Sequence, residues 1–316
     1  MTPAARAFLA GWRIAGRLPE DVVRAVMLVA ADVAWLRRGE GVQRLEANLR
    51  RARPAADRRG LRRLSREGMR TYLRYYAETF LLGRLTTEQI QARVRPVGAD
   101  AVLAETGAGR TALLALAHMG NWDLAGAWAT VHLAPVTTVA ERLEPPEVFD
   151  EFVALREGLG MTIVPLDAGA DVFRVLVRAA RGGGILLPLL ADRDLTSRGI
   201  EVDLLGERAR VAAGPAALAV MTGSPLFATT IRHERLRGAR RRAAGARWGI
   251  VLTFIPVAPP AEGTRSEQVQ QLTQAWVDLV GADIAADPTH WHMLQRVFLA
   301  DLDPARLAAQ APAGDR

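Results

Sequence analysis

Hydrophobic positions change their spacing along the chain, and this change separates an N-terminal part from the rest. In residues 1–83, apolar side chains recur every three or four positions, which predicts helices. We expect three or four helices there, including Glu20–Arg38, Val42–Arg53 and Arg58–Leu82. Gly39 follows the first of these, as a helix stop signal should.

After residue 83, short apolar runs alternate with helical patterns. The runs predict strands at Thr111–Ala117, Val136–Ala140, Thr162–Pro165, Ile185–Leu190 and Val202–Leu205, and a hairpin of Leu226–Arg237 and Trp248–Val257 around a Gly/Arg-rich turn. The helical patterns predict helices at Leu124–Val131, Pro146–Leu159, Asp171–Arg181, Gly214–Thr222 and Ser266–Asp287, and a short one around Met293–Leu299. This alternation predicts an α/β fold with a central, mostly parallel sheet flanked by helices.

The same patterns predict how the chain is organised. We expect one structural domain with two functional regions. We expect residues 1–83 to form a helical region and residues 84–304 to form the α/β core. Residues 305–316 are expected to be a frayed tail.

Positive charge is concentrated in the first quarter of the chain. Residues 1–75 contain 17 arginines and 7 acidic residues, a balance of +10. The remaining 241 residues contain 24 arginines and 27 acidic residues, a balance of −3. A basic surface attracts an anionic partner, either nucleic acid or an acidic membrane face.

The N-terminal region lacks the ~20 mostly apolar residues that a membrane-spanning helix needs. Its best candidate, Val22–Leu36, contains Arg24 and Asp32. We therefore expect the basic helices to lie on a membrane surface, with Trp12 and Trp35 entering the acyl boundary and arginines at the headgroups. The alternative is a solvated, arginine-rich helix pair that covers the core.

Composition narrows the chemistry. The chain has no cysteine, which excludes a disulfide framework, a thiolate zinc site, an iron–sulfur cluster and a cysteine nucleophile. Half of its residues are hydrophobic, which excludes a disordered chain.

The most informative polar residues follow the predicted strand Thr111–Ala117. His118 stands at its carboxyl end, Gly120 allows a tight bend and Asp123 opens the next helix. Ligands bind at such strand ends in open α/β sheets. A turn can bring Asp123 to the imidazole, leaving one ring nitrogen as a base for a substrate hydroxyl. The alternative is structural: His118 ends a strand and Asp123 caps a helix.

Two further segments contain polar residues that are candidates for a site. The predicted strand Ile185–Leu190 is followed by Asp192 and Arg193, which either face solvent or converge on a site, where Asp192 would polarise His118 or bind a sugar hydroxyl. His290 and His292 lie near the C-terminus without a third metal ligand placed by the sequence. We predict no metal and favour a polar lining of a substrate cleft, with a structural role as the alternative.

These segments together resemble a known family. His118-Met-Gly-Asn-Trp-Asp123 matches the His-x4-Asp motif of glycerolipid-type acyltransferases, in the form used by the bacterial lipid A lauroyl/myristoyl acyltransferase family. Its later blocks are matched, in order, by Ala191–Thr196, Val211–Ala216 and Met221–Pro225. Within the family, the chain most resembles the actinobacterial phosphatidylinositol mannoside acyltransferases, through Met69–Tyr76, Leu155–Met161 and Trp291–Gln295.

The resemblance implies transfer of a long fatty acyl chain from acyl-CoA to a mannose hydroxyl of phosphatidylinositol mannoside. It places the protein peripherally on the cytoplasmic face of the plasma membrane. It also implies that residues 1–83 serve membrane docking and the acyl channel, and that residues 84–304 are the acyltransferase core. We expect no cofactor apart from acyl-CoA as co-substrate, and a monomer.

The resemblance also assigns roles to residues. His118 matches the general base and Asp123 its partner, and Asp192 falls where the mannoside enzymes usually carry the longer glutamate. We expect backbone N–H groups near Gly120 and Asn121 to stabilise the oxyanion. The residues expected to bind substrate are Asn121, Glu141, Arg156, Arg193, His290 and His292.

Two other functions fit parts of the pattern. One is an acyltransferase of the same fold that takes its acyl group from acyl carrier protein and acts on a lipid A-like glycolipid. The other is a nucleic-acid-binding protein that uses the basic N-terminus. The basic region has no recognisable nucleic-acid module, so we expect no nucleic acid partner.

Overall fold

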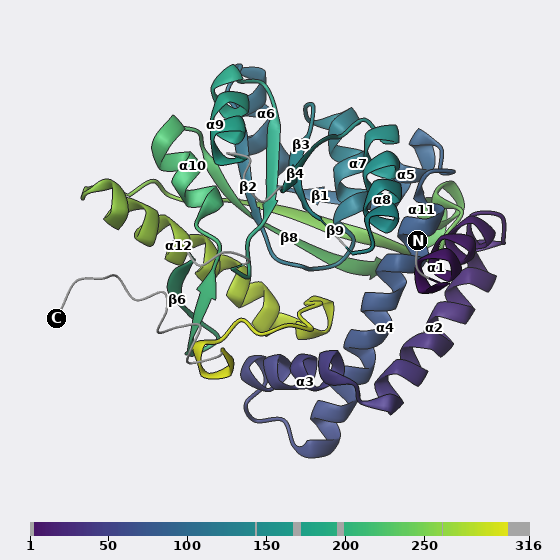
Figure 1. Ribbon diagram of the computed structural model, residues 1–316. Coiled ribbons are helices and arrows are strands. Elements are labelled where there is room, and N and C mark those ends of the chain that lie inside the picture. The colour runs from purple at the N-terminus through teal and green to yellow at the C-terminus, as the bar shows by residue number, and fades with distance from the viewer. Residues whose placement is uncertain (1–2, 143, 167–171, 195–198, 261, 303–316) are drawn as a thin grey trace.

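A five-stranded sheet with the strand order β1-β9-β8-β2-β5 forms the centre of the computed structural model (Figure 1). The structure describes residues 3–142, 144–166, 172–194, 199–260 and 262–302. Neighbouring strands run parallel except β8 and β9, which are antiparallel. The strands are β1 (Val94–Val97), β2 (Ala112–Leu116), β5 (Leu186–Leu190), β8 (Leu226–Arg235) and β9 (Trp248–Pro256).

The parallel pairing continues beyond β5. Strands β3 (Thr137–Glu141) and β4 (Thr162–Leu166) pair in parallel, and a parallel bridge joins Val136 to Leu186 at the start of β5. The Thr138 hydroxyl also donates a 2.6 Å hydrogen bond to the Pro188 carbonyl in β5. A separate antiparallel hairpin of β6 (Ile200–Leu204) and β7 (Glu207–Val211) follows.

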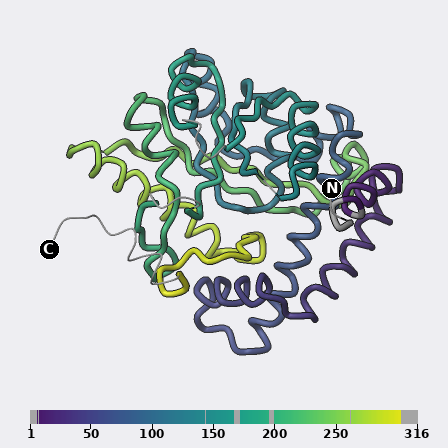
Figure 2. Tube along the Cα trace, viewed as in Figure 1, coloured from purple at the N-terminus to yellow at the C-terminus, as the bar shows by residue number. Residues whose placement is uncertain are grey.

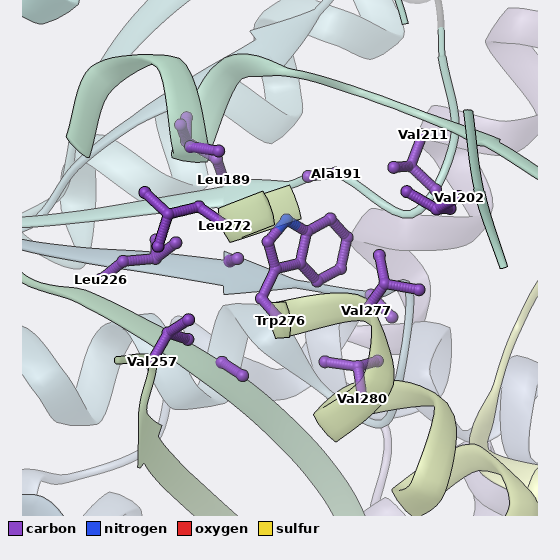
Figure 3. Packing of buried hydrophobic residues seen from close by; sticks show 14 of the residues in the cluster. Leu189, Ala191, Val202, Val211, Leu226, Val257, Leu272, Trp276, Val277 and Val280 are labelled. Atoms are coloured by element: carbon purple, nitrogen blue, oxygen red, sulfur yellow. The ribbon is translucent and has the colours of Figure 1, made fainter. Parts of the chain in front are cut away.

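Helices cover both faces of the sheet because its central strands are apolar on both sides. Leu113 and Leu187 belong to one buried cluster, and Leu114 and Leu186 belong to another. The first cluster includes α9 (Val172–Gly182), α10 (Gly214–Thr222) and α12 (Arg265–Ala286), whose Trp276 lies at the centre of Figure 3. The second includes α5 (Thr87–Arg93), α6 (Ala99–Gly107), α7 (Trp122–His132) and α8 (Pro146–Gly158).

The N-terminal helices lie at one edge of the fold and reach the C-terminal segment. They are α1 (Pro3–Ala15), α2 (Glu20–Arg37), α3 (Glu40–Ala52) and α4 (Arg58–Leu82). Asp57 caps α4 by accepting a hydrogen bond from the Gly60 backbone N–H. Figure 2 traces the C-terminal segment back to this region. There the Asn48 side chain donates to the carbonyls of Met293 and Gln295 at 2.8 and 3.0 Å.

The predicted fold class is confirmed, and most predicted elements form within a few residues of their expected ends. The short helix expected around Met293–Leu299 is wrong: this segment lies between the 3₁₀ helices Pro288–His290 and Leu299–Asp301 and pairs with neighbouring loops and strands. The Gly/Arg-rich turn of the hairpin contains the helix α11 (Gly238–Ala244). The sequence reading missed α5, β1, α6 and β7. Asp171 and the expected tail 305–316 lie outside the described residues.

Of the two tryptophans expected at a membrane, Trp12 is buried inside the protein and Trp35 is half-buried. Trp12 is only 7% exposed, and its ring lies 5.0 Å from that of Phe80 and 4.7 Å from that of Phe152. The Trp35 indole donates to the Ser65 hydroxyl, and Arg62 stacks over its ring. Within the described residues, no helix is long and apolar enough to span a membrane.

Candidate functional site

Two neighbouring parallel strands bring His118 and Asp192 together. Leu116 at the end of β2 is in register with Leu190 at the end of β5. Each functional residue follows two positions later, so the two side chains meet at the carboxyl edge of the sheet. The sequence alone left two alternatives for Asp192, a position in a solvated loop or a contact with His118 or a sugar hydroxyl, and the structure shows the contact with His118.

The Asp192 carboxylate holds His118 at two points. Its Oδ1 lies 2.6 Å from Nδ1 of the imidazole, and its Oδ2 accepts the His118 backbone N–H at 3.0 Å. The indole N–H of Trp291 donates to the same Oδ2 at 2.8 Å. Burial raises the pKa of Asp192, but the charge of His118 and these hydrogen bonds lower it by more. The pKa of Asp192 therefore lies below its usual value. The carboxylate is therefore ionised at neutral pH.

This contact fixes which imidazole nitrogen is available. An ionised carboxylate only accepts hydrogen bonds, so Nδ1 carries the proton and Nε2 keeps its lone pair. No described residue is hydrogen-bonded to Nε2, and the His118 ring, 21% exposed, lines a cavity. The ring is thus arranged as a base that faces the cavity.

Asp123 does not contact the imidazole, contrary to the sequence-based expectation. Its Oδ1 accepts the Nε–H of Arg156 at 2.7 Å, and its Oδ2 accepts the Tyr75 hydroxyl at 2.8 Å. The first turn of α7 points the carboxylate at α4 and α8, so the imidazole partner is Asp192 instead. The pKa of Arg156 is raised because the charge of Asp123 and its hydrogen bond outweigh burial, and the arginine stays charged.

The loop between His118 and α7 has a tightly constrained backbone. Gly120 has a φ of +58°, and a Cβ there would lie 2.5 Å from the Ile231 carbonyl oxygen. Its N–H donates to the His290 carbonyl at 3.1 Å, so this group is not free to serve the expected oxyanion. Asn121 caps α7 and donates to Glu78 at 2.8 Å, and it does not line the cavity.

The cavity beside His118 has a volume of about 330 Å³ and lies between α7 and the sheet. Three small residues, Ala125, Gly126 and Ala129, face it from α7 and leave room above the strands. The apolar part is lined by Leu114, Leu116, Val136, Leu186, Leu252 and Phe254, among others. The polar lining residues are Tyr72, Tyr75, Tyr76, His118, Asp123, Thr138, Glu141, Arg156, Arg193, Thr229, His292 and Gln295.

Two residues expected to bind substrate form an ion pair on the cavity wall. Arg193 donates to Glu141 at 2.6 Å. The Glu141 side chain is 43% exposed, so solvent screens much of this interaction. Glu141 is the last residue of β3 and Arg193 stands three residues after β5, so the ion pair links the carboxyl ends of these two strands.

The two C-terminal histidines have different surroundings. His292 is 6% exposed, lines the cavity, and neither ring nitrogen has a hydrogen-bond partner in the described residues. Burial, together with the positive charge of neighbouring histidines and Arg74, lowers the pKa of His292 well below 6.5, so its ring is neutral. His290 does not line the cavity, and its Nε2 lies 3.3 Å from Asp287.

Sequence reasoning missed three residues that shape the site. Tyr75 holds Asp123, Trp291 holds Asp192 and Glu78 holds Asn121. Tyr75 and Trp291 lie in the blocks Met69–Tyr76 and Trp291–Gln295 of the family resemblance, which gave no role to either residue, and Glu78 lies outside these blocks. In the described residues, no group of three or more acidic, histidine or cysteine side chains is arranged to bind a metal ion.

The fold and the site define an α/β enzyme with a histidine–carboxylate pair at the strand ends beside a largely apolar cavity. The family model described as bacterial lipid A biosynthesis acyltransferase matches residues 4–300, so the chain belongs to this family and is an acyltransferase. The resemblance drawn from the motifs is thereby confirmed.

The chain is also similar to individual curated proteins of one name. The chain is 36% identical over 304 residues to a phosphatidylinositol mannoside acyltransferase of Mycolicibacterium smegmatis, covering 95% of this chain and 93% of the relative. It is 38% identical over 308 residues to the protein of the same name from Mycobacterium tuberculosis, covering 96% of this chain and 90% of the relative.

Proposed function

We propose that this acyltransferase moves a long fatty acyl chain from acyl-CoA to a mannose hydroxyl of phosphatidylinositol mannoside, with His118 as general base. The observation that carries the proposal is the His118–Asp192 pair at the polar end of an apolar cavity. The names of the relatives, at 36–38% identity over nearly the whole chain, support this acceptor.

The proposed chemistry needs no covalent intermediate on the enzyme. Nε2 of His118 takes the proton of the acceptor hydroxyl while the oxygen attacks the thioester carbonyl. Asp192 stabilises the imidazolium that forms. The tetrahedral intermediate then collapses, the C–S bond breaks, and the imidazolium returns its proton to the leaving thiolate. The products are the acylated mannoside and free CoA.

Binding of the two substrates follows from the two parts of the cavity. The acyl chain fits the apolar part, where each buried CH₂ contributes about 0.8 kcal/mol. The sugar fits the polar part, where Arg156, Glu141 and the unpartnered ring of His292 offer donors and acceptors.

We further propose that α2 rests on the cytoplasmic face of the plasma membrane, in the peripheral location expected from the sequence. Its outer face exposes Val22, Val26, Val29, Val33 and Leu36, which are 39–66% exposed and spaced four, three, four and three residues apart. This spacing forms one continuous apolar stripe. It replaces Trp12 and Trp35 as the membrane-contacting group, and the arginine excess around it favours an anionic leaflet.

A transfer assay tests the main proposal. Purified protein is mixed with palmitoyl-CoA or palmitoylated carrier protein, and with phosphatidylinositol mannoside or a lipid A precursor, and the products are measured by mass spectrometry. We expect one acyl mass added to the mannoside from palmitoyl-CoA, and loss of this product in His118→Ala. Transfer only from carrier protein to the lipid A precursor would favour the alternative named above.

The matched control is His132→Ala, because His132 stacks on Trp128 at the far end of α7 and does not line the cavity. This variant should keep its activity. Full activity in folded His118→Ala would refute the base assignment.

Sedimentation with anionic vesicles tests the membrane proposal. Val29→Glu combined with Leu36→Glu should reduce sedimentation, because two charges then interrupt the stripe. Val131→Glu alters another exposed apolar residue, 60% exposed on α7, and should sediment as the unmodified protein does. Equal sedimentation of all three proteins would refute docking through α2.

A further inference from the structure

Trp291 donates a hydrogen bond to Asp192, the partner of the proposed base, and its segment pairs with the loop that carries His118. Met119 and Trp291 form an antiparallel bridge. On either side of it, the His292 N–H donates to the His118 carbonyl at 2.7 Å and the Gly120 N–H donates to the His290 carbonyl. The C-terminal segment therefore fixes the backbone of the loop from 118 to 120.

Side chains alternate along this extended segment, as they do in a strand. His292 lines the cavity, whereas Trp291 does not line it and is fully buried. The Trp291 indole N–H reaches Asp192 Oδ2 at 2.8 Å. Asp192 is itself 2% exposed, so water cannot replace this donor without a structural change.

The ring of Trp291 is held firmly. It packs edge-on against Phe298, with centroids 6.4 Å apart and planes at 87°. Arg51 in turn lies 4.1 Å over the Phe298 ring. This packing and the hydrogen bond to Asp192 together hold the indole in its orientation.

We propose that Trp291 is a positioning residue of the transfer reaction: its N–H fixes the Asp192 carboxylate in the orientation that holds Nδ1 of His118. The inference rests on the proposed role of His118 as base. Without the indole donor, Oδ2 keeps only the His118 backbone N–H, and the carboxylate can turn away from the imidazole. Trp291 acts through Asp192 and touches neither substrate.

The test variant is Trp291→Phe, which removes the N–H and keeps an aromatic ring. Losing one hydrogen bond to a buried charge is expected to lower kcat about 10- to 100-fold. KM for both substrates should change less than about twofold, because no substrate contact is lost. The acid limb of the kcat/KM profile should move to higher pH. The indole donor stabilises the Asp192 charge most when His118 is neutral, so its loss favours protonation of His118.

Trp276 supplies a matched control. It is 1% exposed, and its indole nitrogen has no hydrogen-bond partner in the described residues. Trp276→Phe is thus the same substitution at an equally buried site without the hydrogen bond. We expect its kcat to stay within about twofold of the unmodified protein.

A double-mutant cycle separates positioning from simple packing. In an Asp192→Asn background, Trp291→Phe should lower kcat by less than about twofold more, because its target is already altered. An equal loss in both backgrounds, a loss confined to KM, or an equal loss in Trp276→Phe would each overturn the inference.

A measurement on the protein without substrates covers the case in which Trp291→Phe does not fold. The chain has 7 tryptophans, and one indole N–H resonance should shift downfield of the others and lose that shift in Asp192→Asn. Unchanged indole spectra would overturn the inference. Transfer activity that survives in His118→Ala refutes the proposed function, whereas its loss there combined with full activity in Trp291→Phe refutes only the role of Trp291.

Discussion

Two buried carboxylates at the site differ in the partner they hold: Asp123 lines the cavity, and Asp192 is bonded to His118, which lines it. Asp192 is paired with the imidazole of His118, and Asp123 is paired with the guanidinium of Arg156. Each also accepts one hydrogen bond at 2.8 Å from an aromatic side chain, the first from an indole and the second from a phenol. Their side chains are equally buried, at 3% and 2% exposure.

The difference shows which carboxylate can take part in a proton transfer. Arginine keeps its proton at any pH used for an enzyme, so the charge of Asp123 is always balanced. Histidine gains and loses a proton, so the charge of Asp192 is balanced only when His118 is protonated. In the proposed mechanism Asp192 therefore stabilises a transient cation, whereas Asp123 is part of the polar lining of the cavity.

The largest expected effect comes from Asp192→Asn. The amide cannot balance the imidazolium and allows the wrong imidazole tautomer, so kcat should fall on the order of 10³- to 10⁴-fold. KM for the mannoside should change little. Steady-state transfer rates at saturating substrate measure this, with circular dichroism as the control for folding. A fall in kcat of less than tenfold would contradict the different roles argued for Asp192 and Asp123.

Asp123→Asn is the matched change at the second buried carboxylate. It leaves the charge of Arg156 unbalanced, and the Arg156 side chain is only 17% exposed. We expect the free energy of unfolding to fall by about 2–3 kcal/mol, less than for a fully buried pair. Denaturant unfolding measures this loss.

The kinetic effect of Asp123→Asn should differ in kind from that of Asp192→Asn. We expect KM to rise about tenfold, with a smaller change in kcat, because the wall that holds the substrate is disturbed. A kcat as low as that of Asp192→Asn, together with unchanged stability, would show that Asp123 serves the base directly.

The sequence predicted both strands that carry His118 and Asp192 but not that these strands are neighbours. The apolar runs before His118 and Asp192 identify β2 and β5, and each residue stands two positions beyond its strand. Periodicity within a strand says nothing about its neighbour, and 74 residues separate the two partners. Asp123 was the nearer carboxylate in the sequence, and the His-x4-Asp spacing favoured it for that reason.

Two of the missed elements are strands with weak signals in the sequence, and two missed residues make contacts that local spacing does not predict. Strand β1 is four residues long and exposes three of them, so it lacks a clear apolar run. Strand β7 alternates charged and apolar residues, Glu207–Val211, next to a charged hairpin partner. Tyr75 lies within a helix whose apolar spacing is fully explained by packing, and only the three-dimensional structure shows that its hydroxyl reaches Asp123. Trp291 follows from the bridge to Met119, a contact that local pattern does not encode.

Tyr75→Phe gives the smallest expected effect and sharpens the comparison, because it removes the phenolic donor of Asp123 as Trp291→Phe removes the indole donor of Asp192. Arg156 still balances Asp123, so stability should fall by about 1 kcal/mol and kcat by less than about threefold. Burial and the charge of Asp123 raise the pKa of Tyr75 well above 10.0, so the hydroxyl stays protonated at every assay pH. The small loss should therefore be independent of pH, while Trp291→Phe moves the acid limb. Parallel kcat/KM profiles of the two variants decide the matter: a shift of the acid limb in Tyr75→Phe would mean that Asp123, too, is coupled to the protonation of His118.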